Sequence, residues 1–215
     1  MRAWWSDYGL YVIGGIALGA AILFGINYYQ TQQVNAEIAA SALYDDLAEH
    51  VTGGNLEAAE TTAAELDSEY GNSSYAAQSK LAMARLYMDK NRDQDAAEAL
   101  NELLEMNGFE HIQHVARVRL AKVLLYQGKP EDVLTLLEGK ENEAFAARYA
   151  EELGDAYVAL GRYDEARASY QAALNEAQPT VDQGLIQLKL LDLPSDAGEA
   201  AADDAAAVPG EDSDE

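Results

Sequence analysis

Histidines and paired carboxylates are the residues of this chain whose types and spacing could carry chemistry. His111 and His114 stand three residues apart, so both would lie on one face of a helix, where two imidazoles can bind zinc. No carboxylate follows at a spacing that completes a known metal site, and the surrounding residues read as the start of a repeat helix. His50 occupies a repeat position that Tyr87 and Tyr157 fill elsewhere, so we predict that it packs.

The carboxylate pairs call for no catalytic explanation. Glu151 with Glu152, and Asp164 with Glu165, fall at helix positions predicted to be exposed, in a chain with 38 acidic and 14 basic residues. The absence of cysteine excludes disulfides, thiolate nucleophiles and cysteine-based metal sites. No predicted strand precedes a glycine-rich phosphate loop. We therefore predict that the protein is not an enzyme and holds no cofactor or metal.

Charge and composition indicate the class of protein. The net charge of -24 argues against nucleic acid, because such binding depends on Lys and Arg that neutralise phosphates. It argues equally against a basic face lying on anionic lipid. Forty alanines, with no proline before Pro130, favour helix over sheet. The predicted fold class is all-α.

The elements that would position any site begin with an apolar N-terminal segment. Residues Tyr8–Ala36 carry no charge, and Tyr8–Ile26 is continuously apolar or glycine, which is long enough to span a bilayer. Aromatic residues flank the segment where such rings settle at membrane interfaces, namely Trp4, Trp5, Tyr28 and Tyr29. We predict a transmembrane helix over residues 8–29 after a short cytoplasmic segment, 1–7. A cleaved signal peptide and a buried core helix are the alternatives.

The distribution of basic residues predicts the orientation of this helix. Arg2 precedes the segment, and no Lys or Arg follows it until Lys80, so the N-terminus is predicted to be cytoplasmic and the remaining chain to lie outside the cytoplasm. Gly15 and Gly19 form a G-x-x-x-G pattern that lets two membrane helices approach closely. The alternative is that glycines fall at this spacing by chance in a membrane helix.

A helical repeat follows the anchor. Residues 148–179 fit a helical hairpin of the tetratricopeptide pattern, carried by Leu153, Gly154, Tyr157, Gly161, Tyr163, Ala166, Tyr170 and Ala173. Weaker copies are centred on turns at Gly54, Asn91 and Gly128. We predict a short α-solenoid of about four degenerate repeats over residues 30–193. A last amphipathic helix would cap it through Val181, Leu185, Leu188 and Leu191, and residues 194–215, with eight acids and no base, are predicted to be a disordered acidic tail.

Solenoids of this kind bind peptides or partner helices on a concave surface lined by the first helix of each repeat. Helix geometry predicts a lining that mixes apolar and charged residues, which would suit extended polypeptide. The predicted lining residues are Gln78, Leu81, Arg85, Met88, Val115, Val118, Lys122, Leu125, Arg148, Glu151, Asp155 and Val158. A solvated face would look similar.

The combination of anchor and repeats resembles the YfgM family, the ancillary subunits of the bacterial SecYEG translocon. The resemblance rests on Trp4-Trp5-x-x-x-Gly9, Ser41-Ala-x-Tyr44, Ala82-x-Ala84-Arg85-Leu86, Arg117-Val-Arg119-Leu120-Ala and Gly154-Asp155-Ala156. The family usually has a longer charged segment before the aromatic pair, and the acidic tail looks like an addition.

The resemblance implies a single-pass protein of the bacterial inner membrane with a periplasmic domain. Its implied partners are a SecYEG-type translocon and a membrane-anchored periplasmic chaperone of the prolyl-isomerase type, and it would assist unfolded secreted proteins. The alternative is a membrane-anchored scaffold that assembles an envelope or secretion complex without binding clients.

Overall fold

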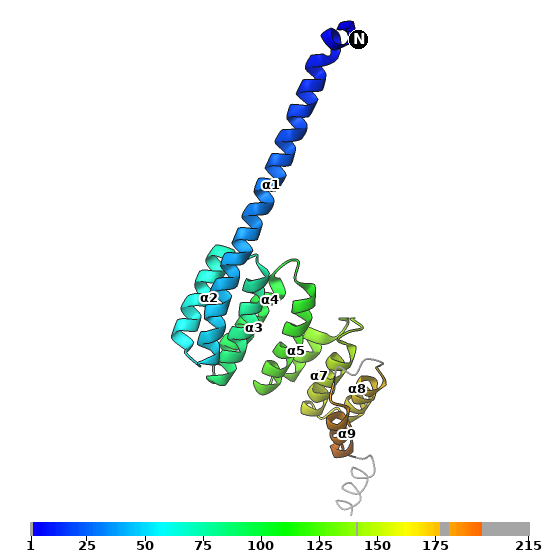
Figure 1. Cartoon of the computed structure of the whole chain (residues 1–215). Coiled ribbons are helices and arrows are strands. Elements are labelled where there is room, and N and C mark those ends of the chain that lie inside the picture. The colour runs from blue at the N-terminus through cyan, green and yellow to red at the C-terminus, as the bar shows by residue number, and fades with distance from the viewer. Residues whose placement is uncertain (1, 141, 177–180, 195–215) are drawn as a thin grey trace, which may run out of the picture. The chain divides into compact units, whose positions relative to one another are not determined.

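The computed structural model describes residues 2–140, 142–176 and 181–194, and within them the side chains of residues 2–14, 16–18 and 21 are not described. All regular elements in these ranges are α-helices (Figure 1). The chain forms two compact units, Met1–Arg92 with Glu105–Phe109, and Asp93–Leu104 with Glu110–Glu215. The helices are α1 Arg2–Thr52, α2 Leu56–Tyr70, α3 Ser74–Asp89, α4 Asp93–Glu105, α5 Glu110–Tyr126, α6 Pro130–Leu137, α7 Ala146–Ala159, α8 Tyr163–Asn175 and α9 Gln183–Asp192.

The turns predicted from the repeat share one backbone geometry. Gly54, Asn91, Gly128 and Gly161 all adopt a left-handed conformation, with φ of 67°, 58°, 70° and 71°. At each turn the N–H of the next residue donates to a carbonyl five residues back, as from Arg162 to Tyr157 at 2.9 Å. This bond closes the preceding helix in a Schellman motif. The all-helical prediction is confirmed, and the turns fall where the repeat pattern placed them.

The first unit is built around the C-terminal part of α1. Figure 1 shows the N-terminal part of this helix standing clear of α2 and α3, while its last turns pack against both. Among the side chains of α1 that are described, the first fully buried one is Ala40, and Leu47 follows two turns later in the core. Two apolar clusters fill this unit, one containing Leu47, Ala59, Met83 and Leu86 and the other Ala40, Leu66 and Ala76.

Within the described side chains, no helix has both the length and the hydropathy of a membrane span. The segment predicted to span the membrane, residues 8–29, falls partly outside them, at residues 8–14, 16–18 and 21. The predicted acidic tail lies outside the described residues beyond Pro194.

The second unit contains the strongest repeat. A buried cluster joins α5, α6 and α7, and a second cluster joins α7, α8 and α9 through Ala166, Tyr170, Ala173 and Ile186. Hydrogen bonds from Gln127 to Asp93 (2.9 Å) and from Gln113 to the Leu104 carbonyl (3.1 Å) connect α5 with α4. The small residues of the repeat lie where α7 and α8 cross, since Ala166 is fully buried there.

The last helix packs in a different register from the predicted one. The predicted contact residues Leu185, Leu188 and Leu191 are exposed, whereas Val181 does pack against the α8 cluster. Ile186 is fully buried instead, and Leu190 and Leu193 pack beside it. α9 carries apolar residues around most of its circumference, so its sequence is compatible with two packing faces. The face formed by Ile186, Leu190 and Leu193 is the one that packs against α8.

Candidate partner-binding face

In the second unit, the first helices of successive hairpins are connected by ion pairs. Lys122 of α5 places Nζ 3.1 Å from Oε1 of Glu152 on α7. Lys189 of α9 places Nζ 2.9 Å from Glu151 Oε1 and 2.7 Å from Asp155 Oδ2, both on α7. One charged cluster therefore runs along the α7 face, and it contains three of the predicted lining residues, Lys122, Glu151 and Asp155.

Glu152 is the most unusual member of this cluster. Its side chain is 2% exposed, and its Oε2 atom has no hydrogen-bond partner among the described residues. The pKa of its carboxyl is raised to about 7, mainly by burial, and the opposing attraction of Lys122 only partly offsets this effect. The nearby carboxylates of Asp155 and Glu151 contribute to the rise. Glu152 therefore titrates near neutral pH, which an exposed glutamate does not do.

Lys189 holds the C-terminal helix to the same face. Burial alone would lower the pKa of its ammonium, but hydrogen bonds to Asp155 and Glu151 outweigh burial and raise it. Asp155 also accepts a hydrogen bond of 2.6 Å from the hydroxyl of Tyr170 on α8. Burial, followed by this hydrogen bond, raises the pKa of Tyr170. Asp155 thus connects α7 with both α8 and α9.

The predicted lining residues fall into two sets because they belong to two units. In the first unit, Arg85 is exposed and lies 3.9 Å from Asp89, while the other three residues are partly buried, namely Gln78, Leu81 and Met88. In the second unit, the exposed residues are Lys122, Arg148 and Val158, and the partly buried ones are Val115, Leu125, Glu151 and Asp155. Val118 is the exception among these residues, because its side chain is buried.

Val118 does not belong to an exposed lining. It is buried in the core cluster of α5, α6 and α7, where it packs with Ala121 and Val133. The helical wheel placed it on the outer face, but the contact with α7 covers that side of α5. Lys122, one turn later, is exposed.

Two polar groups that matter in the structure were not predicted. The sequence interpretation that Glu151 and Glu152 are both exposed is wrong, because both side chains are largely buried. The available signal was periodicity, since Glu152 falls between Tyr149 and Ala156 on the buried stripe of α7. Lys189 carried a similar signal, as a cation on a helix whose neighbouring residues are apolar.

His114 uses both ring nitrogens within the protein. Its Nδ1 contacts the hydroxyl of Tyr149, its Nε2 lies 3.0 Å from Asn142 Nδ2, and its ring stacks on Phe145 with centroids 5.2 Å apart. Burial lowers its pKa, and the neighbouring positive charge of Arg117 lowers it further. These contacts give His114 a structural role. Within the described residues, no group of three potential ligands could hold a metal ion.

The glycines of the N-terminal helix have open space beside them. A Cβ atom at Gly15 or Gly19 would meet no described atom within 4 Å. Neither glycine is required by packing within the described part of this chain, so both are available for a contact with another helix.

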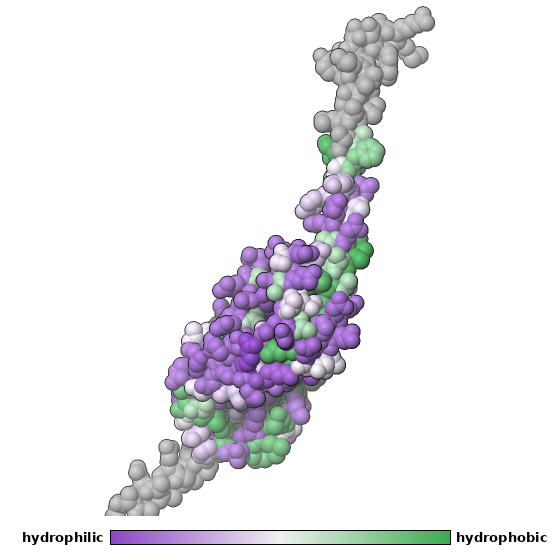
Figure 2. Space-filling view, turned by 90° about the vertical axis from the view of Figure 1, so that its left-hand side faces the viewer, coloured by the Kyte–Doolittle hydropathy of each residue, from purple (hydrophilic) through white to green (hydrophobic). Residues whose placement is uncertain are grey.

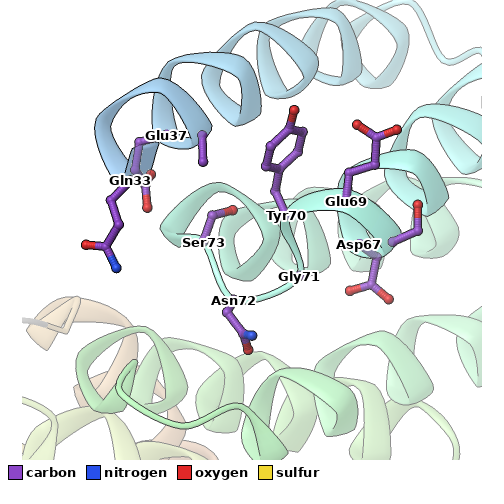
Figure 3. Close-up of a pocket in the computed structure, with 10 residues that line it drawn as sticks. Gln33, Glu37, Asp67, Glu69, Tyr70, Gly71, Asn72 and Ser73 are labelled. Carbon is purple, nitrogen blue, oxygen red and sulfur yellow. The ribbon is translucent and has the colours of Figure 1, made fainter. Parts of the chain in front are cut away.

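A cleft of about 580 Å³ lies in the first unit between α1 and the α2–α3 turn (Figure 3). Gln33 and Glu37 of α1 border one side, and Asp67 to Ser73, from the end of α2 and the turn after it, border the other. Asp67 is paired with Lys80 at 3.2 Å, and Ser73 accepts a hydrogen bond from the Ala76 N–H to cap α3. The remaining carboxylates are exposed, and we assign no ligand to this cleft.

Comparisons with known proteins match the chain over nearly its whole length. A family profile described as a tetratricopeptide repeat-like domain matches residues 2–195. A protein of Escherichia coli (strain K12) named ancillary SecYEG translocon subunit is 27% identical over 197 residues, which cover 90% of this chain and 93% of that protein. Proteins with the same name from Haemophilus influenzae and Neisseria gonorrhoeae are each 29% identical, over 90% and 88% of this chain and 94% and 91% of theirs.

Proposed function

Because the chain belongs to the tetratricopeptide repeat-like family of the ancillary SecYEG translocon subunits, the YfgM-like family, we propose that it is a non-catalytic adaptor of a Sec translocon. The observation that carries this proposal is the extent of the match, which takes in the apolar N-terminal segment together with the repeats. Helical repeats alone occur in proteins of many functions. Their combination with this segment is the specific feature.

A membrane anchor over residues 8–29 is part of the proposal. Its support is the uncharged sequence and the exposure of the apolar side chains that are described, including Ile22, Leu23 and Phe24 at 54%, 69% and 76%. Figure 2 shows this apolar surface in green on the free part of α1. Large exposed apolar surfaces mark contact with a membrane or a partner. In this proposal residues 1–7 are cytoplasmic, and 30–193 and the tail 194–215 are periplasmic.

The proposed work of the repeat domain is to hold other polypeptides beside the channel. The partners are a SecYEG-type translocon and a membrane-anchored periplasmic chaperone of the prolyl-isomerase type, and the clients are unfolded secreted proteins. Confinement of the binding face to the membrane surface raises its effective concentration near the channel exit. A scaffold that joins complexes without binding clients is the competing function.

Two sets of substitutions test the proposal in the full-length protein in mild detergent. Gly15→Leu with Gly19→Leu should weaken recovery of the translocon, because close helix contacts in membranes depend on small residues. Arg85→Glu with Arg148→Glu should weaken recovery of the chaperone while circular dichroism stays helical, since both side chains are exposed. Lys122 is left unchanged because it neutralises the buried Glu152.

The outcomes separate the functions. Wild-type recovery of both partners by either double variant would contradict the two attachments. Photo-crosslinking from Val158 should give many products during secretion if the face holds clients, and a single product if the protein is a scaffold.

A further inference from the structure

A second cleft, of about 480 Å³, lies within the second unit, where residues of α4, α5 and α6 meet. Its apolar side chains are partly or fully buried, namely Leu104, Leu120, Leu124 and Leu136. Its exposed side chains are polar, namely Asn101, Asp132, Thr135 and Lys140. Arg117, which is partly buried, completes the lining. An apolar floor with a few polar groups at the rim is the usual composition of a binding site.

This cleft lies on a different side of α5 from the face that Lys122 shares with α7. Leu124 follows Lys122 by two residues, which is about 200° around an α-helix. Leu120 and Arg117 lie on the side of Leu124, one and two turns before it. Lys122 instead reaches Glu152 on α7. The cleft is therefore separate from the predicted lining of the repeats.

The charge of the cleft has the opposite sign to that of the chain. The chain has 38 acidic and 14 basic residues, yet the lining has two cations, Arg117 and Lys140, and one carboxylate, Asp132, which gives a net charge of +1 (two minus one). Within residues 2–140, 142–176 and 181–194, neither cation is in an ion pair. The cleft therefore matches a ligand with a single negative charge.

Arg117 is held toward α7 by one polar contact. Burial raises the pKa of the Tyr149 hydroxyl, and a hydrogen bond from Arg117 opposes this rise. Tyr149 is 4% exposed, so this contact anchors the guanidinium in a fixed place. A guanidinium has five N–H donors, so others remain for a ligand. Its planar fork matches the two oxygens of a carboxylate, and such charge-assisted pairs are strong.

The size of the cleft and its charge indicate which carboxylate fits. The volume is near the lower end of small-ligand sites, so it accommodates little more than one or two side chains. The C-terminal residue of a polypeptide carries an aliphatic side chain and a carboxylate on the same Cα atom. An internal acidic segment needs two residues for these groups and must also leave the cleft. Asp132 would repel a second carboxylate.

We propose that the cleft between α4, α5 and α6 binds the free C-terminus of a partner polypeptide whose last residue is aliphatic. The side chain of that residue packs on the four leucines, and its carboxylate pairs with Arg117 and Lys140. Asn101 and Thr135 at the rim have the groups to hydrogen-bond the peptide backbone. The inference rests on the proposed function only in that the protein acts by holding other polypeptides.

The test uses full-length protein in nanodiscs of zwitterionic phosphatidylcholine and three labelled peptides. The first is Ser-Gly-Ser-Gly-Ala-Leu with a free C-terminus, the second is the same peptide with a C-terminal amide, and the third is an amidated peptide with Glu-Leu at its centre. Fluorescence anisotropy compares wild type with Arg117→Gln/Lys140→Gln and with Thr135→Glu. Lys129→Gln is the matched control, because Lys129 is an exposed cation outside the cleft.

We expect the free-acid peptide to bind wild type and the control at least tenfold more tightly than either cleft variant. The two amidated peptides should bind wild type at least tenfold more weakly than the free acid, and binding of the free acid should weaken as salt rises. Circular dichroism should show that Thr135→Glu is folded, because Thr135 is exposed. This variant keeps the test decisive even if the loss of Arg117 disturbs the contact with Tyr149.

Five results would overturn the inference. The first is no binding of the free-acid peptide by wild type, or equal binding by wild type and Thr135→Glu. The second is equal binding of the free acid and either amidated peptide. Tighter binding of octanoate than of the free-acid peptide would make an aliphatic acid the ligand. A wild-type dimer that Thr135→Glu abolishes would make a second copy the occupant, and a tenfold gain in peptide binding on deletion of residues 195–215 would make that segment the occupant. None of these measurements depends on recovery of a translocon, so the proposed function would stand or fail separately.

Discussion

The ring of Tyr170 lies so close to Gly154 that a Cβ atom on residue 154 would be 2.4 Å from its Cε1 atom. Tyr170 has little freedom to move, because it is 2% exposed and its hydroxyl donates to Asp155. The close approach of α7 and α8 therefore depends on the absence of a side chain at this position.

Gly154→Ala should lower the free energy of unfolding by about 1 to 3 kcal/mol, the usual cost of overpacking a core. Alanine is better than glycine within a helix by about 1 kcal/mol, so any net loss is due to the contact with Tyr170. Urea unfolding measures the change. In a Tyr170→Leu background, Gly154→Ala should cost little or become stabilising, and an equal loss in both backgrounds would rule out the contact as the cause.

The raised pKa of Glu152 predicts that the free energy of unfolding depends on pH. Its folded pKa, about 7, lies above its ordinary value of 4.5, so the folded state binds the proton more tightly than the unfolded state. The contribution is fully present below pH 4.5 and is lost as pH rises through about 7. Unfolding experiments between pH 5 and pH 8.5 should show wild type losing stability relative to Glu152→Gln, by an amount on the order of 2 kcal/mol.

Lys122→Met is the matched variant for this effect. Removal of the cation takes away the interaction that lowers the pKa of Glu152, so the loss of stability should extend to higher pH than in wild type. Parallel pH profiles for wild type and Glu152→Gln would show that the carboxyl is already ionised in the folded protein at low pH.

Lys189→Ala should loosen α9 from α7. The substitution leaves the partly buried carboxylates of Glu151 and Asp155 without their cation, at a cost of about 1 to 3 kcal/mol. Hydrogen exchange should accelerate in α9 more than in α5. The exposed Lys140 offers a control, and Lys140→Ala should leave exchange in α9 unchanged.

The turn at Asn91 should accept glycine but not alanine. Its φ of 58° is left-handed, a region that costs residues with a Cβ atom about 1 kcal/mol or more unless, like asparagine, they tolerate it. Asn91→Ala should lower the melting temperature, and Asn91→Gly should leave it equal or higher. The reverse order would mean that the turn is not left-handed in solution.

The proposed orientation predicts the result of proteolysis. Protease added to spheroplasts should digest residues 30–215 and leave a small membrane-bound fragment, whereas protease added to inverted vesicles should leave the repeat domain intact. Protection of the domain in spheroplasts would reverse the orientation and remove the secretory role.

The sequence was sufficient to predict the all-helical class and the four left-handed turns, because local residues determine them. Left-handed turns need glycine or asparagine, and Gly54, Asn91, Gly128 and Gly161 occur at the repeat spacing. The close crossing at Ala166 could likewise be predicted from the repeat residues alone. These features require only near neighbours along the chain.

The exposure of the predicted lining residues was harder to predict, because the burial of a side chain depends on which neighbouring helix packs against it. Val118 looks exposed on a helical wheel of one hairpin, and it is covered only when α5 and α7 stack. α9 has leucines on two sides, so its register depends on Ile186 fitting α8 and on Lys189 meeting Asp155. Periodicity within one helix does not contain this information.

Because α1 is one continuous helix, the number of residues in it determines both how far the first unit lies from the apolar segment and in which direction that unit faces. From Ile26, where the apolar run ends, to the buried Ala40 is 14 residues (40 minus 26), about 21 Å of helix, without glycine or proline to act as a hinge. One residue inserted near Gln32 would turn the unit by about 100° around the helix axis and raise it by about 1.5 Å, whereas seven would raise it by about 10 Å with nearly the same heading. In the proposed anchored protein, the distance of the first unit from the membrane and the direction in which it faces therefore change together.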